Sequence, residues 1–171
     1  MIKIQLTKGF MCIIDDIDKD LALEKWQTWS RSDHPGLFYA QISTYTPNRT
    51  RTSIPMHRII LSRMLERPLL SSEHCDHIDG NGLNNVRSNL RLSSNYENTW
   101  NRHKRTSKYS SQYNGVYWYS PTKRWCAAIR CNGTHYHLGY FKDEIAAARA
   151  RDEKAKELYG EFANLNFPDN Y

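Results

Sequence analysis

The chain has 171 residues, a formal net charge of +6 and a hydrophobic fraction of 39%, which suit one ordinary domain or two small ones. No run approaches the roughly 18 apolar residues that cross a bilayer, and the N-terminus lacks the long apolar core and small-residue cleavage site of a signal peptide. The composition therefore argues against a membrane-spanning protein and predicts a soluble cytoplasmic one, whose four cysteines stay free thiols.

The first third of the chain alternates apolar and polar side chains, as in "IKIQLT" and "LFYAQIST". This alternation predicts short strands within residues 1–55, around one helical turn near residues 21–29. The segment "MHRIILSRML", which begins at Met56, has its apolar residues at helical spacing and predicts a helix that stops before Pro68.

The residues that could carry chemistry follow, in "EHCDHIDGNGLNNVRSNLRLSSNYENTWNR". Asp76 and His77 place an oxygen ligand beside a base at the end of a predicted strand, and "DGNG" demands a tight turn. An imidazole, whose pKa lies near working pH, can take a proton from water. A single Mg²⁺ held by one or two oxygen ligands can neutralise a phosphate and support the leaving oxygen. The pattern therefore suits hydrolysis of a phosphodiester. Further amide groups that could bind the metal or hold the loop lie at Asn84, Asn85, Asn89 and Asn98.

The ordered segments "DHIDGN", "GLNN", "NLR" and "EN" resemble the phage and homing branch of the HNH family of ββα-metal (His-Me finger) nucleases. The resemblance covers residues 50–102 well and the preceding residues loosely. It implies that His77 is the general base, that Asp76 and Asn98 ligate a single divalent ion, Mg²⁺ or Mn²⁺, and that Asn89 fixes the loop between two strands. These four residues form the implied catalytic site. The third letter of the family motif, often His, is Asn98 in this chain.

Three neighbouring side chains leave alternatives open. Arg87 and Arg91 would either hold the scissile backbone or face solvent. His57 would either pack within the protein or support catalysis.

The second half of the chain begins with a basic segment. Residues 98–142 contain no Asp or Glu but eight Lys or Arg, together with several tyrosines, which suits a polyanionic partner. Within this segment, the polar and Ser-rich stretch at residues 106–112 predicts a linker. Contacts to DNA phosphates are expected from Arg102, Lys104, Arg105 and Lys108.

Beyond the linker, three strand-like segments, "GVYWYS", "RWCAAIR" and "THYHLGYF", are separated by the turns "PTK" and "CNG". A helix follows in "KDEIAAARARDEKAKELYG", with Asp143 as its N-cap and Gly160 at its end. The apolar side chains that alternation places on the helix side of the sheet are Val116, Trp118, Trp125, Ala127, Ile129, Tyr136 and Leu138. The helix would cover them with a stripe of Ile145, Ala148, Ala155 and Tyr159.

Alternation leaves the opposite sheet face open, with Tyr117, Tyr119, Arg124, Arg130, His135 and His137. Such a face is either merely solvated or, because a narrow sheet fits the major groove, a surface that reads DNA.

The segments "YNGVYWY", "KRWCAAIR", "HLGYF", "EIAAARARD" and "NLNFP" resemble, in this order, the APETALA/ethylene-response-factor DNA-binding domain of plant transcription factors, which also occurs in phage and bacterial nucleases. Plant members carry Arg where Tyr117 and Tyr119 stand, so the base preference is not transferred. The DNA-facing residues that the resemblance implies are Asn114, Tyr117, Tyr119, Lys123, Arg130, His135 and His137.

The sequence thus predicts an α+β protein in two modules. An N-terminal ββα-metal nuclease domain spans residues 1–105, with strands in 1–55 and the catalytic core in 56–105. A linker at 106–112 leads to a three-stranded antiparallel sheet packed on one helix, residues 113–171.

The expected function is that of a metal-dependent HNH endonuclease, of homing or phage type, that hydrolyses duplex DNA at a recognised site. We expect a monomer, with a dimer as the alternative, phage-encoded or in a bacterial cytoplasm, without a membrane partner or small-molecule cofactor. A non-catalytic, sequence-specific DNA-binding regulator that retains the nuclease fold is the alternative function, and an RNA-binding protein is a third.

Overall fold

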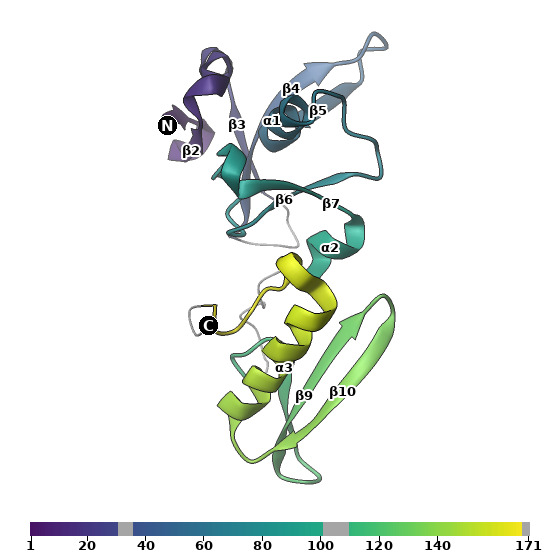
Figure 1. Cartoon of the computed structure of the whole chain (residues 1–171). Coiled ribbons are helices and arrows are strands. Elements are labelled where there is room, and N and C mark those ends of the chain that lie inside the picture. Colours follow the sequence, from purple (N-terminus) through teal and green to yellow (C-terminus); the bar gives the residue numbers. More distant parts are fainter. Residues whose placement is uncertain (31–35, 101–109, 169–171) are drawn as a thin grey trace. The chain divides into compact units, whose positions relative to one another are not determined.

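The computed structural model describes residues 1–30, 36–100 and 110–168, and it leaves the side chains of Tyr96, Asn98 and Thr99 undescribed. The chain divides into two compact units, Met1–Asn95 and Tyr96–Tyr171 (Figure 1). The described residues mix several small antiparallel sheets with few helices, which confirms the predicted α+β class at that level. No described helix is long and apolar enough to span a membrane.

The first unit begins with a β-hairpin and a three-stranded sheet, both antiparallel. Their strands are β1 (Ile2–Gln5) and β2 (Met11–Ile14), then β3 (Gln27–Ser30), β4 (Phe38–Tyr45) and β5 (Arg51–Pro55). Short 3-10 helices at Thr7–Gly9 and Asp16–Leu23 connect the early strands.

The predicted helical turn near residues 21–29 is misplaced. The turn lies earlier, at Asp16–Leu23, and β3 already begins at Gln27. Burial of an acidic side chain explains the difference, because the fully buried Asp18 carboxylate accepts hydrogen bonds from the guanidinium groups of Arg63 and Arg87. This ion-paired cluster fixes the turn at a position that hydrophobic spacing alone does not reveal.

Helix α1 (Met56–Met64) ends before Pro68, as predicted, and packs against β4 and β5 (Figure 1). Its buried residues Met56 and Ile60 join the core that the β1–β2 hairpin and β4 supply through residues such as Ile14 and Ala40.

A second hairpin follows, formed by β6 (His74–His77) and β7 (Leu90–Ser93). A 3-10 helix at Arg87–Asn89 leads into β7, and α2 (Asn95–Trp100) comes directly after it. The connection between β6 and β7 returns to the first hairpin, where Ile13 of β2 donates its backbone N–H to Leu83 O at 2.9 Å.

The second unit contains one antiparallel sheet in the order β10-β9-β8, and α3 packs against all three strands (Figure 1). The bounds are β8 (Val116–Tyr119), β9 (Arg124–Cys131), β10 (Thr134–Phe141) and α3 (Glu144–Tyr159), with a 3-10 helix at Gly160–Phe162. The Asp143 carboxylate accepts a hydrogen bond from Ala146 N at 2.7 Å, which confirms the predicted N-cap.

The predicted apolar stripe of α3 is partly wrong. Ala148, Ala155 and Tyr159 are buried, but Ile145 is 44% exposed. The buried face continues instead through Arg151 and Asp152, whose charged groups bind the segment that returns after the helix. A buried ion pair with backbone partners thus fills the part of this face between Ala148 and Ala155, for which the predicted stripe named no residue. On the sheet, Trp118 is also 40% exposed although it pairs with Trp125 on the helix side.

Candidate active site

The predicted catalytic pair lies at the end of β6, where Asp76 and His77 are 4% and 6% exposed. Strand pairing places Asp76 opposite Arg91 of β7. Arg91 Nε and Nη2 both lie 2.8 Å from Asp76 Oδ2, so the guanidinium compensates the buried carboxylate. Arg91 is therefore an ion-pair partner of Asp76 and does not simply face solvent or wait for substrate. Arg87 is likewise paired with the buried Asp18 carboxylate.

Asn89 holds the loop that follows His77. Its Oδ1 accepts from Asp79 N at 3.0 Å, while its Nδ2 donates to Asp79 Oδ1 at 2.9 Å and to Asn84 O at 2.8 Å. Asp79 itself accepts from Asn81 N and Asn84 Nδ2. These bonds close the tight turn and hold the pKa of the Asp79 carboxyl below its usual value despite partial burial. The loop is therefore a fixed framework behind His77.

The electrostatics around His77 favour a neutral imidazole. Burial lowers its pKa and outweighs the opposing effects of the Asn85 hydrogen bond and of the Asp79 and Asp76 carboxylates. His77 Nε2 lies 3.2 Å from Asn85 Oδ1. A neutral imidazole can accept a proton from water at neutral pH, which is the requirement for a general base.

Two aromatic rings that lie far away in the sequence surround His77. The rings of Tyr39 on β4 and His57 on α1 have their centroids 5.9 Å and 5.1 Å from the His77 ring, and His57 meets it edge-on. Burial, His77 and Arg58 together lower the pKa of His57 to about 3. His57 Nδ1 is buried without a hydrogen-bond partner among the described residues. His57, for which the sequence left packing and catalytic support open, is thus buried against His77.

The ligands predicted for a divalent ion are the Asp76 carboxylate and the Asn98 amide. Asn98 belongs to α2, but its side chain lies outside the described residues. Within the described ranges, no group of three or more His, Cys, Asp or Glu could hold a metal ion. Carboxylate and amide oxygens are nevertheless the hard ligands of Mg²⁺, which keeps several waters and needs only one or two ligands from protein. The Asp76 carboxylate has the chemistry of such a ligand, and its Oδ2 is paired with Arg91.

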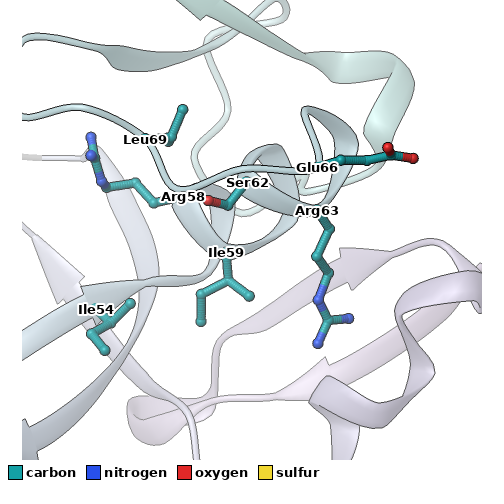
Figure 2. Close-up of a pocket in the computed structure, with 7 residues that line it drawn as sticks. All are labelled: Ile54, Arg58, Ile59, Ser62, Arg63, Glu66 and Leu69. Atoms are coloured by element: carbon teal, nitrogen blue, oxygen red, sulfur yellow. The ribbon is translucent and has the colours of Figure 1, made fainter.

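A separate pocket on α1 holds none of the predicted catalytic residues. It has a volume of about 500 Å³, and its lining comes from β5, α1 and the segment after α1 (Figure 2). The Arg58 guanidinium donates to the carbonyl oxygens of Glu73 and Leu70, and Arg63 binds Asp18 and Asp20. The lining residues are Ile54, Arg58, Ile59, Ser62, Arg63, Glu66 and Leu69. The two arginines of this pocket therefore stabilise the fold.

The open sheet face of the second unit carries most of the predicted DNA-facing residues. Arg130 and His135 are exposed and opposite one another on β9 and β10. Tyr117 is exposed, and the hydrogen bond of its hydroxyl with the Cys126 thiol helps to raise the pKa of Tyr117 to about 12. Lys123 lies exposed in the β8–β9 turn with φ of +50°.

A β-bulge adds a tyrosine that the alternation missed. The register of β10 shifts between His137 and Gly139, which turns Tyr140 to the face of His137. The Tyr140 ring lies 4.8 Å from the His137 ring and 5.1 Å from that of Tyr119, centroid to centroid. The open face therefore holds a continuous aromatic cluster beside its cationic residues.

The remaining predicted DNA contacts are Asn114 and four basic residues before the sheet of the second unit. Asn114 is held by its backbone, because its N–H donates to Asn166 Oδ1 and its carbonyl accepts from Asn166 Nδ2. The predicted phosphate contacts Arg102, Lys104, Arg105 and Lys108 lie outside the described residues, as do most residues of the predicted linker.

Comparison with known proteins connects each part of the chain to named relatives. An uncharacterized HNH endonuclease of Acanthamoeba polyphaga mimivirus is 31% identical over 146 residues, covering 85% of this chain and 73% of the viral protein. Protein 3.8 of Escherichia phage T7 is 28% identical over 111 residues, covering 65% of this chain and 90% of the phage protein. An AP2-like ethylene-responsive transcription factor of Arabidopsis thaliana is 45% identical over 58 residues, which cover 34% of this chain and 12% of the plant protein. No family model and no solved structure matches the chain.

Proposed function

Because this chain belongs to the HNH endonuclease family, we propose that it is a metal-dependent endonuclease that hydrolyses phosphodiester bonds of duplex DNA at a recognised site. The observation that carries the proposal is the buried Asp76–His77 pair, set in front of a loop that Asn89 holds. Burial keeps the His77 imidazole neutral, so it can take the proton from the attacking water.

Each catalytic residue has a distinct task in this proposal. His77 accepts a proton from water, and the Asn89 bonds keep the loop behind it from moving. Asp76 and Asn98 would hold one Mg²⁺ or Mn²⁺ ion. Such an ion supplies neutralisation of charge on the phosphate and support for the leaving oxygen. In this reading, β6, β7 and α2, which follow one another along the chain, form the ββα-metal module.

The second unit would bring the nuclease to its site. Its relation to AP2-like transcription factors and its open, cationic and aromatic sheet face both support DNA binding. The exposed side chains of Tyr117, Arg130 and His135 would contact the groove, and the basic residues of the predicted linker would add phosphate contacts.

Cleavage of supercoiled plasmid tests the proposal. We expect nicked circles with Mg²⁺ or Mn²⁺, because one site per chain cuts one strand per engagement. EDTA should abolish cutting, and renewed Mg²⁺ should restore it. Sustained cutting in EDTA would contradict the metal dependence. DNA binding without cutting under every metal tested would favour the non-catalytic regulator.

A further inference from the structure

Two of the polar atoms that the fold buries without a partner belong to side chains beside His77. Among the described residues such atoms are His57 Nδ1, Asn85 Nδ2, Ser93 Oγ and Arg151 Nε. The His57 ring meets His77 edge-on, and the Asn85 amide contacts His77 Nε2. Buried polar groups without partners are rare in native proteins and call for an explanation such as a catalytic role. The Asn85 amide, which contacts His77 directly, therefore calls for a functional explanation.

The main chain of Asn85 is anchored independently of its side chain. Asn85 N donates to Ile13 O at 2.8 Å, and Ile13 N donates to Leu83 O at 2.9 Å, which ties the loop to β2. The Asn85 side chain is 1% exposed, and its one hydrogen bond described in this structure goes to His77. The backbone therefore performs the structural task, and the buried amide is directed at the imidazole.

The chemistry of that contact selects one form of the His77 ring. Asn85 Oδ1 lies 3.2 Å from His77 Nε2, and an amide oxygen can only accept a hydrogen bond. Nε2 must therefore carry the proton. A neutral imidazole has a single N–H, so its lone pair lies on Nδ1.

We propose that Asn85 is a positioning residue that holds His77 in the tautomer protonated on Nε2, which makes Nδ1 the nitrogen that takes the proton from the attacking water. This inference rests on the proposed nuclease function. The new bond forms between the water oxygen and phosphorus, the bond from phosphorus to the leaving oxygen breaks, and the water proton moves to Nδ1. The leaving oxygen departs with the bonding electron pair and takes a proton from solvent. The resulting imidazolium still donates from Nε2 to Asn85 Oδ1, and Nδ1 later releases its proton to solvent. A carboxylate performs the corresponding task for the histidine of a Ser-His-Asp triad.

Nitrogen NMR of the unmodified protein provides the first test. With ¹⁵N-labelled histidine, the His77 signals are assigned as those lost in His77→Gln, among the seven histidines of the chain. At neutral pH we expect a protonated Nε2 and an unprotonated Nδ1. The opposite pattern would mean that the amide donates to Nε2, and it would overturn the proposal even if neither Asn85 variant folded.

Two substitutions at Asn85 separate positioning from structure. Asn85→Leu removes the acceptor, and we expect mixed tautomers. The kcat for plasmid cleavage should fall about 10- to 100-fold with KM unchanged, the range seen when a hydrogen-bond partner of a metal-ligating histidine is removed. Asn85→Asp keeps an acceptor for Nε2–H, and it should restore the tautomer and most of kcat. Ser93→Ala is the matched control, because Ser93 Oγ is also buried without a described partner but Ser93 lies opposite His74, at the far end of β6 from His77.

An unchanged tautomer and kcat in Asn85→Leu would refute the role of Asn85, as would an equal loss in Asn85→Asp. If the unmodified protein does not cut DNA at all, the nuclease proposal fails, whereas the NMR pattern still decides whether Asn85 sets the tautomer.

Discussion

At the scale of single residues, the site is organised around histidines that burial keeps neutral. Burial lowers the pKa values of both His57 and His77, and each ring contacts the other and Tyr39. For His77 the neutral form is the one that chemistry needs. For His57 the preference for the neutral form lowers the stability of the fold at acidic pH, because the folded state excludes a protonated ring.

His57 gives a prediction for stability against pH. Its folded pKa of about 3 lies below the ordinary 6.5, so the unfolded chain binds the additional proton. Stability is therefore fully present above pH 6.5 and is lost as pH falls from 6.5 toward 3, by at most on the order of 1 kcal/mol per pH unit. His57→Phe, which keeps a ring, should lose less stability than the unmodified protein between pH 7 and pH 5. Urea unfolding at both pH values measures this, and equal losses in the two proteins would contradict it.

The sequence could predict the part of the site that is local. Asp76, His77 and Asn89 fall within one short segment, and turn chemistry together with family resemblance was enough to assign them expected roles. Tyr39 and His57 could not be identified in this way, because β4 and α1 bring them to His77 from distant positions in the chain. The pairing of Asp76 with Arg91 also depends on the register of β6 and β7, which spacing alone leaves open.

At the scale of elements, the loop after β6 must lie against β4. A Cβ placed on Gly82 would come within 2.4 Å of the Phe38 carbonyl oxygen and 2.5 Å of the Tyr39 ring. Only a residue without a side chain allows this approach, which in turn keeps the Tyr39 ring against His77. In the proposed nuclease, Gly82 would therefore affect cleavage through packing.

Gly82→Ala tests that arrangement. Because backbone atoms cannot move aside cheaply, we expect a loss of about 1–3 kcal/mol in the free energy of unfolding. A cleavage rate reduced at least about tenfold should accompany it, since small displacements of catalytic groups are costly. Gly9→Ala is the control, because its added methyl group meets open space and strains only a left-handed backbone. It should lower stability without slowing cleavage at a permissive temperature. Equal cleavage by Gly82→Ala and the unmodified protein would show that the close approach of this loop to β4 does not affect cleavage.

The elements of the second unit follow the periodic sequence pattern in most places and depart from it at two. Alternation and capping predicted three strands and a helix, because a half-buried sheet and an amphipathic helix impose strict periods. The β-bulge before Tyr140 breaks the period of β10, and the buried pair Arg151 and Asp152 interrupts the apolar stripe of α3. Both departures depend on contacts between elements rather than on local sequence.

At the scale of the whole molecule, the proposed function separates DNA binding by the second unit from proton transfer by His77 in the first. Each unit has its own core, with the buried Asp76–His77 pair in the first and an open cationic sheet face in the second. Changes on the sheet face should therefore alter affinity and site preference more than the rate of the chemical step.

Arg130→Ala tests this division. If Arg130 contacts DNA, the variant should bind less tightly, and its plot of log K against log salt should be shallower by about one. Site preference should relax, while single-turnover cleavage at saturating DNA should stay near normal. Arg149→Ala is the matched control, since it removes the same charge from an exposed position of α3, the element that covers the other face of the sheet. An equal change of salt slope in both variants would point to general charge effects instead.

The central claim is that His77 performs the chemistry on DNA that the second unit binds. The most direct measurement compares cleavage and DNA affinity in one preparation of His77→Ala, with His74→Ala of the same strand as the control. We predict that His77→Ala binds DNA like the unmodified protein but cuts it at least about 100-fold more slowly, within the range for loss of a general base, while His74→Ala cuts normally. Cleavage by His77→Ala at the unmodified rate would contradict the account.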